Sequence, residues 1–137
     1  MGSTSFSQYT FTYLAAIDLL ATCPADAESF LRSISPSEPG RIPGHPLERC
    51  LDLFFLNTAE QFSAILSSPL NDELIVSAAT PYLITEGNAN LVPIFEAAHS
   101  IMLAVFSAPQ NVDLTARHLP FYVDTLFKVC SAYSQCW

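Results

Sequence analysis

The chain has 137 residues, of which 50% are hydrophobic and 13% are charged. This composition excludes intrinsic disorder, because disordered chains are poor in apolar residues and rich in charge. Five basic residues stand against thirteen acidic ones, giving a net charge of −8, which excludes the basic stripe that nucleic-acid-binding proteins use to neutralise phosphates. The length suits a single domain, so we expect one domain over residues 1–137.

The first half of the chain predicts three helices and one long loop. Apolar residues recur at helical spacing over residues 8–23 and, after a proline that ends this helix, over residues 24–34. Residues 35–46 contain four prolines and two glycines, a density that neither a helix nor a central strand tolerates, so this segment is expected to be a loop. The strongest helical pattern follows over residues 47–67.

A shorter helix is expected next, with its start marked by polar residues. The run Asn71-Asp72-Glu73 has the composition of a capped, acidic helix start, since negative charge is favourable near the positive end of the helix dipole. The helix should continue over residues 74–83 with a break at Pro81. A turn that contains Gly87 is expected over residues 86–90.

Two further helices are expected at the C-terminal end. The segment 91–107 is apolar on nearly all sides, which is typical of a helix buried on most of its surface. Pro93, Glu96 and His99 interrupt it, so we interpret it as a buried helix and not as a membrane span. The last helix covers residues 113–131, and Pro120 should kink it or divide it in two.

These elements predict an all-α fold. Five or six helices joined by short loops are expected to pack as antiparallel neighbours. Strand-type alternation and exact internal repeats are both missing from the sequence. The pattern fits the stacked helical hairpins of an α-solenoid, and it equally fits a compact bundle.

The cysteine residues predict no disulfide framework. They are Cys23, Cys50, Cys130 and Cys136. Because the N-terminal segment lacks the basic and apolar regions of a secretory signal, the cysteines are expected to be reduced and mostly packed in the interior.

The sequence carries no motif that predicts an enzyme. Phosphate-binding glycine loops, nucleophile elbows and Cys-x-x-Cys pairs are missing. His45, Glu48 and Cys50 could ligate zinc, but structural zinc sites use a second ligand pair that is missing here. His99 is expected to be a hydrogen-bonded core residue, and His118 a surface residue. We therefore predict no catalytic residue, no cofactor and no metal ion.

One set of residues is a candidate contact face or apolar pocket. The set comprises Phe54, Phe55, Phe62, Phe95, His99, Met102 and Phe106. Aromatic stripes of this kind mostly form core, but a helical chain of this length buries only about two-thirds of its surface. With so little charge to cover the remainder, an apolar patch should stay exposed, as at partner contacts or between stacked repeats.

Three functions are compatible with this patch. The first is a scaffold that acts through protein contacts. The second is a small helical enzyme or ligand carrier with an apolar pocket among Phe54, Phe62, His99, Met102 and Phe106. The third is a homodimer that buries the same face. A dry pocket with His99 facing into it would favour the second, whereas a packed His99 beside an open apolar face would favour the first.

Several stretches of the sequence resemble the fungal peroxin-eight family. The clearest are residues 95–111 (FEAAHSIMLAVFSAPQN), 119–127 (LPFYVDTLF) and 50–60 (CLDLFFLNTAE), with 78–83 less similar. The resemblance covers about residues 9–129. These are packing segments and not a catalytic signature, so no functional residue is carried over from the family.

The resemblance implies a peroxisomal location and a scaffold function. The family comprises helical, non-enzymatic proteins on the matrix side of the peroxisomal membrane, which link the cargo receptor and docking machinery to the RING-finger complex during matrix-protein import. Its members are several times longer, so the chain is expected to be a partial or truncated member. Its end, Gln135-Cys136-Trp137, differs from the Ser-Lys-Leu type of targeting tripeptide, which leaves a cytoplasmic location open.

Overall fold

The computed structural model describes residues 2–84 and 88–134, and every element in these ranges is helical. The predicted all-α fold is thereby confirmed. The predicted turn residues Glu86 and Gly87 lie outside the described residues, and so does the chain from Gln135 onward, with Cys136.

Five longer helices and one composite segment form the fold. The longer helices are α1 (Gly2–Ala21), α2 (Pro24–Ile34), α3 (Pro46–Glu60), α6 (Val92–Ser107) and α7 (Val112–Ser134). The composite segment comprises α4 (Ser68–Leu70), η1 (Asn71–Val76), α5 (Ser77–Ala79) and η2 (Thr80–Tyr82), which follow one another without a gap. Short 3₁₀ turns, η3 (Ala89–Leu91) and η4 (Pro109–Asn111), precede α6 and α7.

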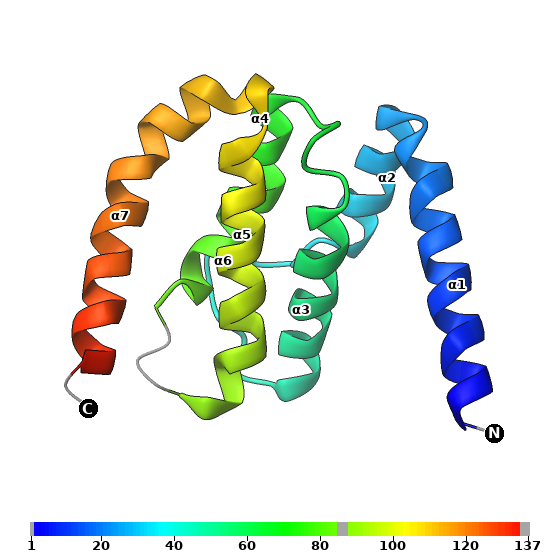
Figure 1. Ribbon diagram of the computed structural model, residues 1–137, viewed down its shortest axis with the longest axis horizontal. Coiled ribbons are helices and arrows are strands. Elements are labelled where there is room, and N and C mark those ends of the chain that lie inside the picture. Colours follow the sequence, from blue (N-terminus) through cyan, green and yellow to red (C-terminus); the bar gives the residue numbers. More distant parts are fainter. Residues whose placement is uncertain (1, 85–87, 135–137) are drawn as a thin grey trace.

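Consecutive helices run antiparallel and stand side by side as hairpins (Figure 1). Helix α1 lies at one edge of the molecule and α7 at the opposite edge, with α3 and α6 between them (Figure 1). The two terminal helices therefore do not close on each other. This open row corresponds to the stacked-hairpin alternative, in which each hairpin contacts only its neighbours.

Prolines mark the places where the helices begin. Pro24 and Pro46 are the first residues of α2 and α3, where a missing N–H costs nothing. The Nδ1 atom of His45 accepts a hydrogen bond from the backbone N–H of Leu47 and caps α3. Between α2 and α3, residues 35–45 carry no helix, in agreement with the expected loop.

The core lies between α3, the composite segment and α6. Its largest fully buried side chains are Tyr82, Phe55, Phe62, Leu31, Leu56, Leu66, Ile75, Leu83, Ile101, Met102, Leu114 and Val105. Helix α6 contributes one face to this core, with Ile94, Ala98, Ile101, Met102 and Val105 buried. Its opposite face stays exposed at Glu96, Ser100 and Leu103, so the expectation of a helix buried on most of its surface is met on one face alone.

One segment among the described residues is long and apolar enough to cross a membrane. It is Ala89–Ser107, with a mean hydropathy of 1.5. Length and composition alone also select the central helix of a helical stack, and α6 occupies that position between α3 and α7 (Figure 1). The protein itself buries 39% of this window, and the interpretation of the segment as a buried helix stays a prediction.

The predicted helix cap at Asn71 is wrong. The helical segment begins earlier, at Ser68, and Asn71 is fully buried at the start of η1. Its Nδ2 donates to the backbone oxygens of Ser63 and Leu66 and to the Oδ1 of Asn111. Asn71 thus joins two chain connections instead of capping its own helix.

One other local prediction differs from the structure. Helix α3 ends at Glu60, and residues 61–66 form turns instead of continuing the helix to residue 67. Pro120 lies inside α7, which is one helix and is not divided in two. The axis of α7 bends in the first half of the helix (Figure 1), as expected where a proline removes a backbone hydrogen bond.

The expectation that the cysteines are packed in the interior is wrong for two of them. Cys50 and Cys130 are exposed, on α3 and α7, and Cys23 is half-buried. Both exposed thiols lie on helix faces that no other described element covers, which periodicity alone does not reveal.

Candidate functional site

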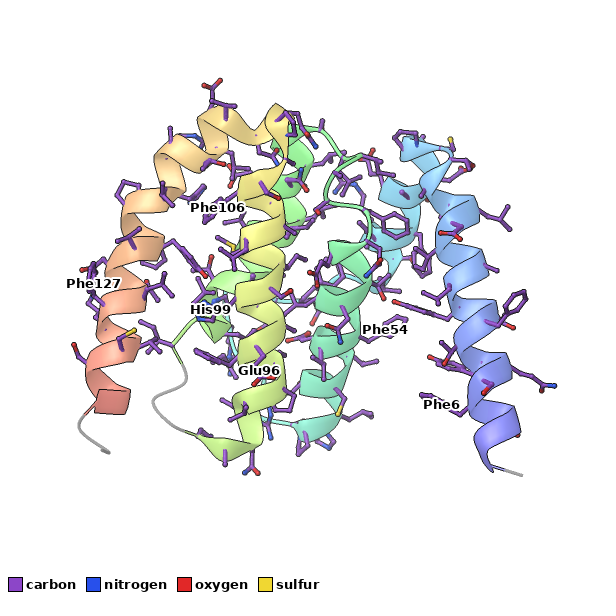
Figure 2. All side chains as sticks on the ribbon, viewed as in Figure 1. Phe6, Phe54, Glu96, His99, Phe106 and Phe127 are labelled. Atoms are coloured by element: carbon purple, nitrogen blue, oxygen red, sulfur yellow. The ribbon has the colours of Figure 1, made fainter. Side chains whose placement is uncertain are left out.

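The structure separates the seven predicted contact residues into interior and outer members. Phe55, Phe62 and Met102 are at most 1% exposed and belong to the core. Phe54 is 37% exposed and points from α3 toward α1 (Figure 2). The other three, Phe95, His99 and Phe106, are half-buried on α6, and Figure 2 shows His99 and Phe106 on the side of α6 that faces α7.

His99 connects α6 to α7 and to the end of η2. Its Nε2 lies 3.0 Å from the backbone oxygen of Leu83 and its Nδ1 lies 2.9 Å from the hydroxyl of Tyr122. A carbonyl can only accept, so Nε2 donates to Leu83, and in the tautomer with its proton on Nε2 the Nδ1 atom accepts from the Tyr122 hydroxyl. The rings of Phe95 and Tyr122 lie 4.5 and 5.5 Å from the imidazole.

These contacts make His99 a packed structural residue. Both ring nitrogens have internal partners, so neither is free to bind a ligand or to accept a proton from a substrate. Burial raises the pKa of Tyr122, which keeps its hydroxyl protonated as the donor. The hydrogen-bonded position predicted for His99 is confirmed.

A second buried pair joins α3 to η2. The hydroxyl of Tyr82 donates to Oδ2 of Asp52, and both residues are buried. Burial raises the pKa of the Asp52 carboxyl, the charge of Glu48 raises it further, and the Tyr82 hydrogen bond lowers it in part. Burial likewise raises the pKa of Tyr82.

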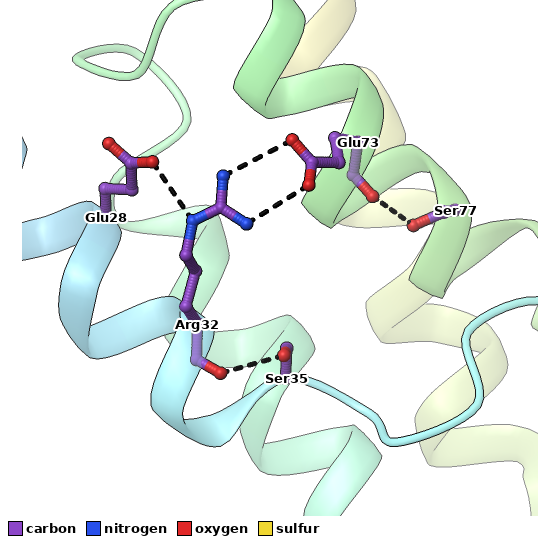
Figure 3. A network of polar contacts seen from close by, with 5 residues as sticks. All are labelled: Glu28, Arg32, Ser35, Glu73 and Ser77. Atoms are coloured by element: carbon purple, nitrogen blue, oxygen red, sulfur yellow. Dashed lines mark hydrogen bonds and ion pairs between the residues drawn. The ribbon is translucent and has the colours of Figure 1, made fainter.

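Surface ion pairs tie the outer hairpins to the composite segment. The guanidinium of Arg32 donates two bonds to Glu73, at 3.1 and 3.3 Å, and one to Glu28 at 3.0 Å (Figure 3). The hydrogen bond from Arg32 lowers the pKa of Glu73. On the other side, Arg117 and His118 of α7 both contact Asp72.

Helix α1 exposes apolar side chains around much of its circumference. The exposed ones are Phe6, Tyr9, Phe11, Leu14 and Leu19. The helix is held by α2, by burial of Ile17, and by a 2.8 Å hydrogen bond between Tyr13 and Thr58 of α3. Asp18 is its one charged residue, so little polar surface covers this helix.

Helix α7 carries a regular apolar stripe that no described element covers. The stripe consists of Val112, Leu119, Val123 and Leu126, which are 37–67% exposed. With the exposed Ala116, these residues follow spacings of four, three, four and three, the pattern of a helix–helix seam. Phe127 points away from α6 beside this stripe (Figure 2). We call Val112, Leu119, Val123 and Leu126 the α7 outer face.

The predicted contact set missed both of these surfaces. The heptad spacing of α7 was readable in the sequence and could have identified the apolar stripe itself. What the sequence does not reveal is which stripes of a helix remain without a neighbour, because that depends on which hairpins stack. For α1 no comparable periodic signal exists, since its exposed residues are spread around the helix.

The described residues contain no group of three His, Cys, Asp or Glu side chains that could hold a metal ion. Of the three zinc-ligand candidates, His45 caps α3 through Nδ1, and Cys50 and Glu48 are exposed on that helix.

The fold is a row of antiparallel helical hairpins, which is the class to which TPR-like repeat domains belong. A family model described as the PEX8 central TPR-like domain matches residues 27–107, more than half of the chain. The chain therefore belongs to this peroxin family. The matched region runs from within α2 through α3 and the composite segment to the end of α6.

A curated relative extends the similarity over almost the whole chain. The "Peroxisomal membrane protein PEX17" of Yarrowia lipolytica is 29% identical over 138 aligned positions, which cover 90% of this chain and 20% of the relative. The chain thus spans about a fifth of the length of this relative. No solved structure matches.

Proposed function

We propose that the chain is a non-enzymatic scaffold segment of the peroxisomal matrix-protein import machinery and acts through protein contacts. The observation that carries the proposal is the exposure of apolar side chains on the two terminal helices, at opposite edges of the row of hairpins (Figure 1). In stacked-repeat proteins such edges contact the next hairpin or a partner. Membership in the PEX8 central TPR-like family supports this function.

We further propose that the chain is one helical domain of a longer helical-repeat protein, a member of the fungal peroxin-eight family. Its share of the PEX17 relative and its exposed edges support this organisation. The proposed location is the matrix side of the peroxisomal membrane. The proposed partners are the import receptor or components of the docking and RING complexes.

The contacts of His99 weigh against the alternative of an enzyme or ligand carrier with an apolar pocket. Both of its ring nitrogens are engaged inside the protein, and three members of the suggested pocket (Phe62, His99, Met102) are packed against other side chains. A homodimer through the α7 outer face remains an alternative that the experiment below separates from the scaffold function.

The test measures binding of the purified chain to purified import receptor, docking components and RING components. The wild-type chain is compared with a Leu119→Gln/Val123→Gln double variant, which makes the α7 outer face polar while keeping good helix formers. An Asp124→Gln/Lys128→Gln variant, on the charged side of the same helix, is the matched control.

We expect at least one component to bind the wild-type chain and the control, and to lose most of its affinity for the outer-face variant. Failure of all the components to bind the wild-type chain would overturn the scaffold proposal. Self-association of the wild-type chain without any such binding would favour the homodimer.

A further inference from the structure

A groove lies between α2, the loop 35–45 and α3, separate from the two edges of the molecule. Its volume is about 580 Å³, within the range of sites that hold small ligands or a few side chains of a peptide. Its lining includes the apolar Ile34, Leu51 and Phe54 and the acidic Glu38, Glu48 and Asp52. We call it the α2–α3 groove.

The cations near this groove already have partners. Arg41, which lines the groove, is paired with Glu38 at 3.0 Å, so these two charges offset each other. The guanidinium of Arg49 donates to the backbone oxygens of residues 43 and 44. Neither guanidinium forms an ion pair with the other two carboxylates of the groove among the described residues.

Glu48 and Asp52 thus leave the groove with an excess of negative charge. Glu48 is exposed, whereas Asp52 is 7% exposed and, among the described residues, is bonded to the neutral hydroxyl of Tyr82 alone. A buried carboxylate without a cationic partner is costly. A positively charged group that enters the groove would gain two carboxylates and displace no existing ion pair.

Apolar surface lies beside these carboxylates. Leu51 is 58% exposed and Phe54 is 37% exposed, one on each side of Asp52 in the sequence. Leucine and phenylalanine side chains that remain open in a concave site are places where an apolar side chain of a ligand can bury its own surface.

The loop that forms one wall offers free backbone groups. Residues 37–44 make no backbone–backbone hydrogen bond among the described residues. Pro39 and Pro43 lack an N–H, and Arg49 already occupies the carbonyl oxygens of residues 43 and 44. The other N–H and C=O groups of residues 37–42 can pair with an extended chain. A groove with open backbone groups, unpaired carboxylates and apolar surface matches a peptide better than a free cation.

We propose that the α2–α3 groove binds a short extended segment of a partner protein in which a lysine or arginine stands next to an apolar residue. The cation lies between Glu48 and Asp52, and the apolar side chain rests on Leu51 and Phe54. The net charge of −8 attracts such a segment at longer range. This site is independent of the α7 outer face.

The test uses an array of acetylated and amidated hexapeptides with randomised flanks around a central Lys-Leu or Arg-Leu pair. Matched peptides carry Gln-Leu or Glu-Leu at the same place. We expect the purified chain to bind the cationic peptides at least about tenfold more tightly than the Glu-Leu peptides, an energy difference of about 1.4 kcal/mol. High salt should reduce this preference.

Two single variants and two matched controls locate the binding. Glu48→Gln removes a charge from the groove, and Leu51→Ala removes apolar surface; each should weaken binding severalfold without lowering the melting temperature appreciably, because both side chains are exposed. Glu96→Gln and Leu103→Ala make the same changes on α6, where Glu96 is exposed (Figure 2) and Leu103 is 56% exposed, and should leave binding unchanged.

Equal binding of cationic and acidic peptides would overturn the proposal. The proposal would also be overturned if both groove variants bound the cationic peptides as tightly as wild type, or if the α6 controls lost as much affinity as the groove variants. A wild-type chain that binds no peptide of the array would overturn it as well, while the proposed contacts through the α7 outer face would stand or fall by their own measurement.

Discussion

Two adjacent phenylalanines on α3 give the sharpest prediction about the fold. Phe55 is completely buried in the core, whereas its neighbour Phe54 is 37% exposed. Phe55→Ala removes a buried aromatic ring and leaves a cavity, which costs about 3–5 kcal/mol in well-packed cores. Phe54→Ala loses part of the ring's buried area and a tilted contact with Tyr13 at 6.1 Å, an effect of about 1 kcal/mol.

The free energies of unfolding are obtained from urea titrations followed by far-UV circular dichroism. A loss of 3–5 kcal/mol would lower the melting temperature by roughly 10–20 °C for a domain of this size, so Phe55→Ala should be partly unfolded under conditions in which Phe54→Ala is fully folded. Equal losses for the two variants, or a larger loss for Phe54→Ala, would refute the assignment of one residue to the core and the other to the surface.

Two further predictions concern buried polar groups. Asn71→Ala leaves Oδ1 of Asn111 without its donor, while Gln110 still donates to the backbone oxygens of Ser63 and Leu66. The free energy of unfolding, measured by urea titration, should fall by about 2 kcal/mol. An unchanged free energy of unfolding would contradict the buried hydrogen-bond network. Asp52→Asn tests a carboxyl whose pKa is raised in the folded protein. Such a group stabilises the fold below its ordinary pKa and loses this contribution as the pH rises through the raised value, so the variant, which still accepts from Tyr82, should be more stable than wild type at neutral pH. The stability advantage of the variant should shrink as the pH is lowered toward about 4. A difference in melting temperature between the variant and wild type that stays constant or grows on acidification would contradict this prediction.

Periodicity predicted the elements well because each helix shows apolar residues at the spacing of its buried face. The loop at 35–45 and the starts of α2 and α3 followed from proline, whose effect on the backbone is local. Local rules were insufficient at Asn71, because its amide donates to Ser63, 8 residues away, and to Asn111, 40 residues away. Helix-capping rules consider only residues at the end of the helix itself, so they do not predict these partners.

The surface was harder to predict than the helices. Phe54 and Phe55 are the same residue type at adjacent positions, and only the placement of α1 and α6 around α3 decides which one is covered. The α7 outer face has a periodic signal, but a stripe of this kind has the same sequence whether another helix covers it or not. The α2–α3 groove depends on how a proline-rich loop folds back on two helices, for which no sequence pattern exists.

The central claim is that apolar surface at the edges of the row of hairpins is open for protein contacts. Light scattering coupled to size exclusion, with a hydrophobic dye added, tests it most directly. We predict dye binding and concentration-dependent association for the wild-type chain, both reduced in Leu119→Gln/Val123→Gln and unchanged in Asp124→Gln/Lys128→Gln. A wild-type chain that stays monomeric and binds no dye would contradict the claim.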